Sequence, residues 1–213
     1  MYLSRVKIDR ENRKKMKNLT HLGDFHSWVE ESFPDEIEVG ERNRKLWRID
    51  SIGKVVYLLL LSQTKPDKTL FEKYAIPESF ESKSYQSVLN HIETGDKYYF
   101  QLTANPTKSV KNSDNKTERG QVVPLISVED QLNYLMERSE KNGFYLKNNN
   151  FTLIERGHHS LYRNKKRLNV VSATYQGILT VKDEEVFKKT LMYGLGRKKA
   201  YGFGLLTIIP MEE

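Results

Sequence analysis

The sequence contains no cysteine, no long apolar run and no spaced set of metal-binding side chains. Without cysteine among 213 residues, disulfides and thiolate metal sites are excluded, which fits a cytoplasmic protein. The best apolar run, "VVYLLLL" at 55–61, is far shorter than the roughly 18 residues of a membrane span, so no membrane partner is expected. The histidines do not form H-E-x-x-H, and neither an acidic array nor a lysine-containing phosphate loop is present. We therefore expect neither metal nor cofactor.

Acidic side chains are in the minority, and the basic ones are clustered. The formal net charge is +7, which favours a polyanionic partner such as nucleic acid. An ionisable fraction of 30% also fits a generally charged surface. The clustering favours the nucleic-acid partner, because cations recur at 10–17, 42–48, 108–119, 163–167 and 197–199.

Apolar alternation and helix-boundary residues predict two similar runs of elements. The first has strands over 1–8, 46–51, 54–62 and 96–104, with helices over 20–33 and 69–75. The second has strands over 122–125, 144–155, 168–181 and 203–209, with helices beginning after Ser127 and Asp183. Each run reads β-α-β-β-α-β and predicts an α+β fold of tandem ferredoxin-like, or RRM-like, domains. One larger α+β domain is the alternative.

The expected division of the chain follows from a polar stretch in its middle. Residues 106–120 lack a hydrophobic period and are predicted to be a connector. Residues 1–105 would then form the N-terminal domain and residues 121–213 the C-terminal domain. In the first helix, Thr20 is a good N-cap and Pro34 a stop.

The stretch "GLGRKKAYGFGLL", beginning at Gly194, combines glycines with consecutive cations. A dinucleotide-binding glycine motif leaves a strand and opens a helix, whereas this stretch follows a helix and precedes a strand, so a nucleotide cofactor is excluded. It predicts a loop whose backbone N–H groups approach an anion, with Arg197, Lys198 and Lys199 in reach. The alternative is an ordinary helix-to-strand turn.

His26 is the outstanding candidate for chemistry. It lies near the margin of the apolar stripe of the 20–33 helix, and His21 lies at the start of that helix. RNA carries its own nucleophile, the 2′-OH, so cleavage needs only a base, an acid for the leaving 5′-oxygen and cations for the phosphate. The alternative is a polar histidine on the flank of a helix, without chemistry.

The segment "HHSLYRNKKR" at 158–167 is predicted to be a basic hairpin tip. Such a tip can straddle the phosphates of an RNA helix, whose narrow major groove leaves shape and backbone to be recognised. An ordinary solvated tip is the alternative.

Several segments together resemble one family across essentially the whole chain. They are "MYLSRVKI" at the start, "LWRID" at 46–50, "LTANPTK" at 102–108, "VPLI" at 123–126 and "GLGRKKAYGFGLLTIIP" at 194–210. These segments resemble the CasE (Cse3) subfamily of CRISPR-associated endoribonucleases of the type I-E system. The resemblance implies tandem ferredoxin-like domains and metal-independent cleavage of CRISPR precursor RNA at the base of the repeat hairpin. It also implies a 2′,3′-cyclic phosphate product and retention of the guide RNA as a subunit of Cascade.

The resemblance also implies roles for individual residues. The family's catalytic histidine, seven residues before the Phe-Pro that ends the helix, matches His26. RNA contacts are implied for these residues: Lys108, Arg163, Lys165, Lys166, Arg167, Gly194, Gly196, Arg197, Lys198, Lys199 and Gly202. A family tyrosine is replaced by Gly23, so the catalytic partner of His26 is His21, a tyrosine from elsewhere or water. A family arginine that is expected to contact phosphate is replaced by Thr103. A non-catalytic RNA-hairpin-binding subunit on the same fold is the alternative function.

Overall fold

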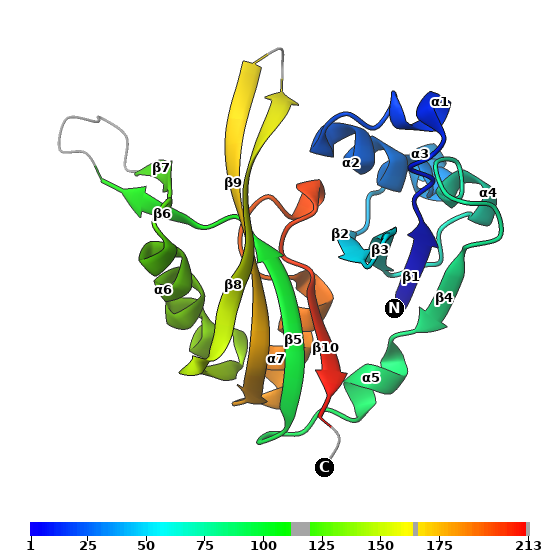
Figure 1. Cartoon of the computed structure of the whole chain (residues 1–213). Coiled ribbons are helices and arrows are strands. Elements are labelled where there is room, and N and C mark those ends of the chain that lie inside the picture. The colour runs from blue at the N-terminus through cyan, green and yellow to red at the C-terminus, as the bar shows by residue number, and fades with distance from the viewer. Residues whose placement is uncertain (112–119, 164–165, 212–213) are drawn as a thin grey trace.

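A computed structural model describes residues 1–111, 120–163 and 166–211, without the side chains of residues 162–168. Two antiparallel four-stranded sheets dominate it, in the orders β2-β3-β1-β4 and β10-β5-β9-β8. Each order puts the first and third strands of a β-α-β-β-α-β unit at the centre of its sheet, the ferredoxin-like arrangement. The predicted α+β fold of tandem ferredoxin-like units is confirmed (Figure 1).

The first half of the chain has a hydrophobic core of its own between its sheet and one of its helices. Its strands are β1 (Tyr2–Lys7), β2 (Leu46–Ile52), β3 (Val55–Ser62) and β4 (Glu81–Ser84). Its helices are α1 (Arg13–Met16), α2 (Leu22–Glu31), α3 (Pro34–Val39), α4 (Lys68–Phe71) and α5 (Gln86–Asn90). Trp28 and Val29 of α2 are buried with Val6 of β1 and Leu58 of β3 in one core. Burying this apolar side of α2 leaves His26 on a different side of the helix.

The second half covers one face of its sheet with two long helices (Figure 1). Its elements are β5 (Lys97–Ala104), α6 (Val128–Ser139), η1 (Glu140–Asn142), β8 (Phe144–Arg163), β9 (Lys166–Val181), α7 (Glu184–Tyr193), η2 (Lys199–Tyr201) and β10 (Leu206–Pro210). Leu135 of α6 and Phe187 of α7 are buried against Tyr175 and Leu179 of β9. None of the described helices is long and apolar enough to cross a membrane.

Two strands belong to other sheets than the sequence predicted. The strand expected over 96–104 was assigned to the first unit, but β5 lies between β10 and β9 in the second sheet. The fourth strand of the first sheet is β4, whose sequence ESKS lacks the apolar alternation of a strand. The strand expected over 122–125 is β7 (Gln121–Pro124), which pairs with β6 (Thr107–Val110) inside the predicted connector. The boundaries at 105 and 120 stay a prediction, although β5 pairs only within the second sheet.

A buried arginine joins the two sheets. Arg48 of β2 donates to the carbonyls of Gln101 in β5, at 2.9 Å, and Leu205 before β10, at 3.0 Å. Its charge is matched by Asp50, whose carboxylate lies 2.6 Å from Nε. A buried guanidinium needs all of these partners, so the contact strongly favours one relative position of the two sheets.

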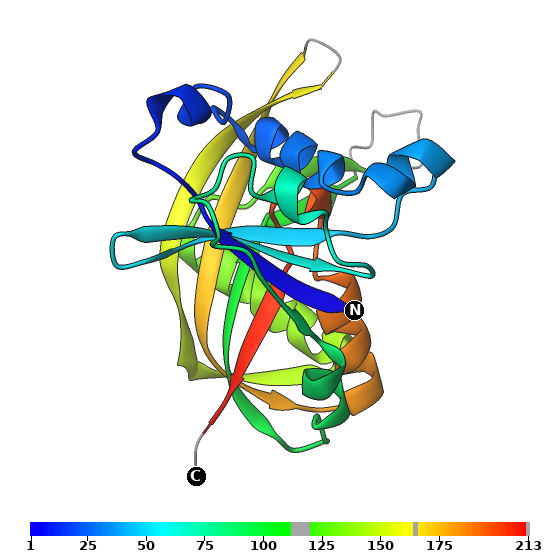
Figure 2. The same ribbon diagram turned by 90° about the vertical axis from the view of Figure 1, so that its right-hand side faces the viewer.

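The long β8–β9 hairpin reaches from the second sheet to the first half of the chain (Figures 1 and 2). Leu161 of β8 and Val170 of β9 form a small cluster with Phe203, against which Leu22 of α2 and Tyr201 of η2 pack. The amino-terminal part of α2 therefore meets both the hairpin and the loop that precedes β10.

Candidate active site

The first turn of α2 is closed by His21 and Asp24. The Nδ1 atom of His21 accepts a hydrogen bond from the Asp24 N–H at 3.3 Å, and the Asp24 carboxylate accepts one from the His21 N–H at 3.1 Å. This reciprocal pair is a capping box, which satisfies free N–H groups at a helix start. Thr20, the predicted N-cap, instead donates its hydroxyl to Asp24 at 2.9 Å. One ring nitrogen of His21 is thus engaged in capping α2.

His26 lies in the middle of α2, with its side chain 28% exposed. Its ring centroid is 5.4 Å from that of Tyr201 in η2, with the rings tilted by 57°. Burial lowers the pKa of His26 below its ordinary value. Glu30 raises that pKa, whereas Arg42 and Lys45 lower it further. The imidazole is therefore neutral at neutral pH and still reaches solvent, as a general base must.

The glycine loop, residues 194–204, is fastened to both sheets. The indole N–H of Trp47 in β2 donates to the Ala200 carbonyl at 3.0 Å, and the Gly204 N–H donates to the Thr103 carbonyl at 2.7 Å. Gly202 has a φ of +84°, and a Cβ there would lie 2.7 Å from the Trp47 ring. Glycine is needed at position 202 for both its backbone conformation and its lack of a side chain.

Two further glycines of the loop are also explained by packing. A Cβ at Gly194 would meet the Leu46 side chain at 2.7 Å, and one at Gly196 would meet the Tyr134 hydroxyl at 2.7 Å. The Gly194 N–H already donates to the Thr190 carbonyl at 2.8 Å. The predicted contacts of Gly194, Gly196 and Gly202 with RNA stay a prediction.

These cations lack carboxylate partners. Within the described residues, no carboxylate lies within 4.0 Å of the side-chain nitrogens of Arg44, Arg197, Lys198 or Lys199. Burial lowers the pKa of the Lys199 ammonium, and the neighbouring charge of Arg44 lowers it further. An anion bound here would relieve this repulsion. The loop therefore brings these cations to the side of α2 that carries His26.

The other sequence-predicted site residues are not brought to this point. Lys108 is exposed on β6, and the β6–β7 hairpin lies on the opposite side of the β8–β9 hairpin from α2 (Figure 1). The backbones of Arg163 and Lys166 face each other at the described end of the β8–β9 hairpin, and Arg167 faces Tyr162. Lys165 lies outside the described residues. The predicted basic hairpin is therefore present as two paired strands, while its RNA contacts stay a prediction.

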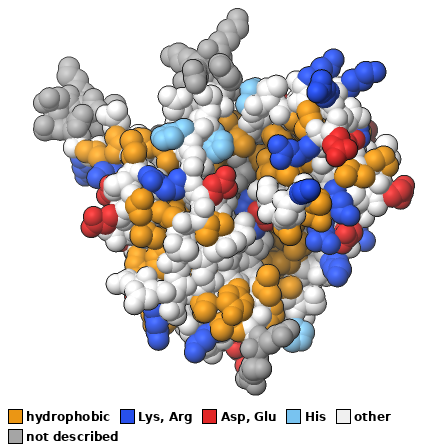
Figure 3. All heavy atoms as spheres, viewed as in Figure 1, with side chains coloured by type: hydrophobic (Ala, Val, Ile, Leu, Met, Phe, Trp, Pro, Cys, Tyr) orange, Lys and Arg blue, Asp and Glu red, His pale blue; other side chains and the backbone are white. Residues whose placement is uncertain are grey.

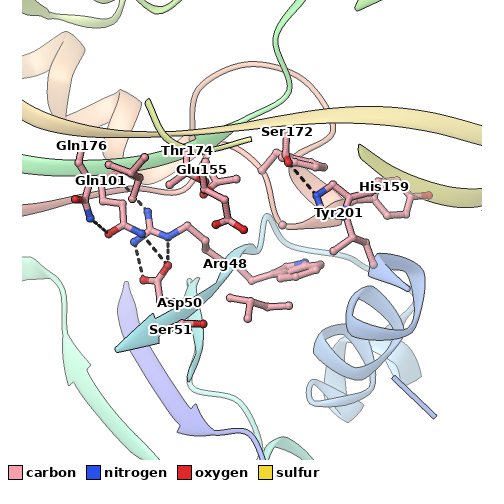
Figure 4. A pocket seen from close by; sticks show the side chains of 17 residues that line it. Arg48, Asp50, Ser51, Gln101, Glu155, His159, Ser172, Thr174, Gln176 and Tyr201 are labelled. Atoms are coloured by element: carbon pink, nitrogen blue, oxygen red, sulfur yellow. Dashed lines mark hydrogen bonds and ion pairs between the residues drawn. The ribbon is translucent and has the colours of Figure 1, made fainter. Parts of the chain in front are cut away.

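A cavity of about 340 Å³ opens between the two sheets beside the loop. Figure 4 shows Arg48 and Gln101 at one end and His159, Ser172 and Tyr201 at the other. His159 Nε2 and Ser172 Oγ are hydrogen-bonded at 2.9 Å, and burial lowers the pKa of His159. Figure 3 shows the surface hollowed between the two halves, with histidine side chains near the hollow. Tyr201 lines this cavity and also contacts His26.

Comparison with known proteins places this geometry in a family. Residues 1–210 match the family model described as CRISPR associated protein. The chain belongs to this family. The CRISPR-associated endoribonuclease Cse3 of Thermus thermophilus is 27% identical over 223 residues, covering 99% of this chain and 100% of that protein. The Cascade subunit CasE of Escherichia coli is 25% identical over 218 residues, with 99% and 100% covered.

Solved structures agree with these relatives. Thermus thermophilus Cse3 bound to an RNA representing a pre-cleavage complex matches this CRISPR-associated protein with a TM-score of 0.79 and 25% identity, covering 98% of each chain. The resemblance to the CasE (Cse3) subfamily is thereby confirmed.

Three residues of the site in this CRISPR-associated protein were not singled out from its sequence. Tyr201 lies inside the quoted glycine stretch, but nothing in the sequence shows that its ring meets α2. Glu30 follows His26 by four residues, the spacing at which helical side chains are neighbours, and could have been found by that rule. Arg44 belongs to the cationic cluster at 42–48, but its nearness to Lys199 depends on tertiary structure.

Proposed function

We propose that this CRISPR-associated protein is a cytoplasmic endoribonuclease that cleaves CRISPR precursor RNA at the base of the repeat hairpin. Attack by an RNA 2′-OH on the adjacent phosphate leaves a 2′,3′-cyclic phosphate and a 5′-OH. The protein then keeps the guide RNA and acts as a subunit of Cascade. The observation that carries the proposal is the half-buried imidazole of His26 in ring contact with a loop whose cations have no carboxylate partner among the described residues.

The proposed reaction divides the work among groups on α2 and the glycine loop. His26 takes the proton of the 2′-OH, because a neutral imidazole is a base near neutral pH. Lys199, with Arg44 beside it, balances the charge that develops on the phosphate. The leaving 5′-oxygen needs a proton, and we assign it to the Tyr201 hydroxyl. His21 is the weaker candidate because its Nδ1 caps α2.

Metal-free cleavage is the test of the proposal. In excess EDTA, the protein is expected to cleave a hairpin repeat RNA, because the RNA itself supplies the nucleophile. Mass spectrometry should find a 2′,3′-cyclic phosphate on the upstream fragment. In a series of RNAs with single 2′-deoxy substitutions, one position should block cleavage without weakening binding. Tight binding with every RNA left intact would instead identify a non-catalytic RNA-binding subunit.

Lys199→Ala is expected to weaken binding of the same RNA. Losing one phosphate contact should lower the slope of the logarithm of the binding constant against the logarithm of salt concentration by about 0.9 if the contacted RNA is duplex-like. Fluorescence anisotropy over a salt series measures this slope.

Lys97→Ala is the matched control for this charge. Lys97 is exposed at the start of β5, whereas the loop contacts Thr103 near the other end of that strand, about 20 Å away at the usual strand rise. The salt dependence of RNA binding by Lys97→Ala should have the same slope as that of the wild type. A slope that is also unchanged in Lys199→Ala would remove Lys199 from the RNA interface.

A further inference from the structure

The ring of His26 has a carboxylate from its own helix on one side. Nδ1 of His26 lies 3.9 Å from Oε1 of Glu30, four residues later on α2. Residues at this spacing lie one above the other on a helix surface, so the helix itself brings the two side chains together. A neutral imidazole carries a proton on only one of its two nitrogens, and a nearby carboxylate favours the proton on the nitrogen that faces it.

The Glu30 carboxylate is itself held by a buried lysine. Lys45, with a side chain only 2% exposed, lies 3.5 Å from Glu30 and 2.6 Å from Glu36. Its ammonium is also 4.6 Å from the centre of the Phe33 ring, and the Glu36 carboxylate accepts the N–H of Asn43 at 3.0 Å. Burying a lysine is unfavourable unless it is fully paired, so this cluster has little freedom to rearrange.

We propose that Glu30, anchored by Lys45, is a positioning residue that keeps the proton of the neutral His26 ring on Nδ1 and leaves the Nε2 lone pair to take the 2′-OH proton. The claim that Nε2 takes the 2′-OH proton rests on the proposed function. The claim that Glu30 keeps the proton of the neutral ring on Nδ1 concerns the protein alone and can be tested without RNA. In the reaction, the 2′-OH gives its proton to Nε2 as the O2′–P bond forms. The P–O5′ bond breaks, the leaving 5′-oxygen takes a proton from the Tyr201 hydroxyl, and the ring of His26 becomes an imidazolium beside Glu30.

Groups from two further segments lie near His26. Arg42 and Lys45 precede β2, and the glycine loop adds Tyr201, with Lys198 Nζ 6.0 Å from the Tyr201 ring centre. Glu30 raises the pKa of His26, whereas Arg42 and Lys45 lower it. Because the neutral ring is the base, the rate falls as pH drops through this pKa. Removing Glu30 should move that fall to lower pH, and removing Arg42 should move it to higher pH.

The experiment compares Glu30→Gln with Arg42→Gln. Nitrogen NMR of the protein alone should show His26 protonated on Nδ1 when neutral, and a mixture of both tautomers in Glu30→Gln. Single-turnover cleavage of a hairpin repeat RNA is measured from about pH 5 to about pH 8. The rate on the high-pH plateau should be about 10-fold lower for Glu30→Gln. The acid limb, the part of the pH–rate profile where the rate falls as pH drops, should lie at lower pH than in the wild type. Arg42, whose side chain is 70% exposed, should keep the plateau rate when replaced, with its acid limb at higher pH.

Glu30→Asp is the second variant, in case Glu30→Gln does not fold. It keeps a negative charge for Lys45 but withdraws the carboxylate from His26 by one methylene, and should reproduce the tautomer mixture. An Nε2-protonated ring in the wild type, or a tautomer and acid limb unmoved in both Glu30 variants, would overturn the inference. A protein that never cleaves RNA but shows the expected NMR change would contradict the proposed function and leave the role of Glu30 in the ring intact.

Discussion

His26→Ala is expected to slow single-turnover cleavage of a hairpin repeat RNA by about 10²- to 10⁴-fold, the usual contribution of a positioned proton acceptor. The RNA dissociation constant should change little, because the cations of the glycine loop are untouched. His26 is half-buried on α2 and its nearest described ring neighbour is Tyr201, so alanine leaves the core residues Trp28 and Val29 in place. Rates from quenched time courses and binding by anisotropy measure the two quantities separately.

The matched control is the other half-buried imidazole near the loop. Burial also lowers the pKa of His159, which is hydrogen-bonded to Ser172 and lies 6.1 Å, between ring centres, from Phe203. His159→Ala should cleave at close to the wild-type rate. His21→Asn keeps an acceptor for the first turn of α2 and should do the same. Normal cleavage by His26→Ala would remove His26 from the mechanism, and a large loss in His21→Asn would restore His21 as its partner.

The local features of the fold were accessible from the sequence, and the pairing between distant segments was not. The apolar spacing of α2 and the proline after Phe33 predicted that helix to within two residues at each end. "YYFQLTA" indicated a strand, but alternation does not tell which sheet a strand joins. β4 was not predicted from the sequence, because it pairs only with β1 and an edge strand with an exposed face needs no apolar pattern.

The same limit applies to the site. The position of His26 at the margin of the apolar stripe follows from helical periodicity. Its contact with Tyr201 joins segments from the two halves of the chain, and depends on Arg48 and Trp47 of β2 reaching the second sheet and the glycine loop. No periodicity carries that information. The sequence predicts that the glycines let backbone N–H groups approach an anion, whereas the structure shows that they are needed for packing, as the contact of Gly202 with Trp47 illustrates.

Tyr201→Phe is expected to slow cleavage by about 10²-fold, because it removes only the hydroxyl that we assign to the leaving 5′-oxygen. A phenolic hydroxyl carries its proton at neutral pH and is therefore suited to give one. Phenylalanine keeps the ring contact with His26 and the packing against Leu161 and Phe203. The melting temperature and RNA affinity should therefore stay near the wild-type values, and single-turnover rates should fall.

A substrate with sulfur in place of the bridging 5′-oxygen separates this role from that of His26. A thiolate is a much better leaving group than an alkoxide and needs no proton as it departs. Tyr201→Phe should cleave such an RNA at nearly the wild-type rate, whereas His26→Ala should remain slow, because the 2′-OH must still lose its proton. If sulfur instead rescues His26→Ala, then His26 is the acid and the base lies elsewhere. If it rescues neither variant, the Tyr201 hydroxyl does not protonate the leaving group, and its proximity to His26 serves packing alone.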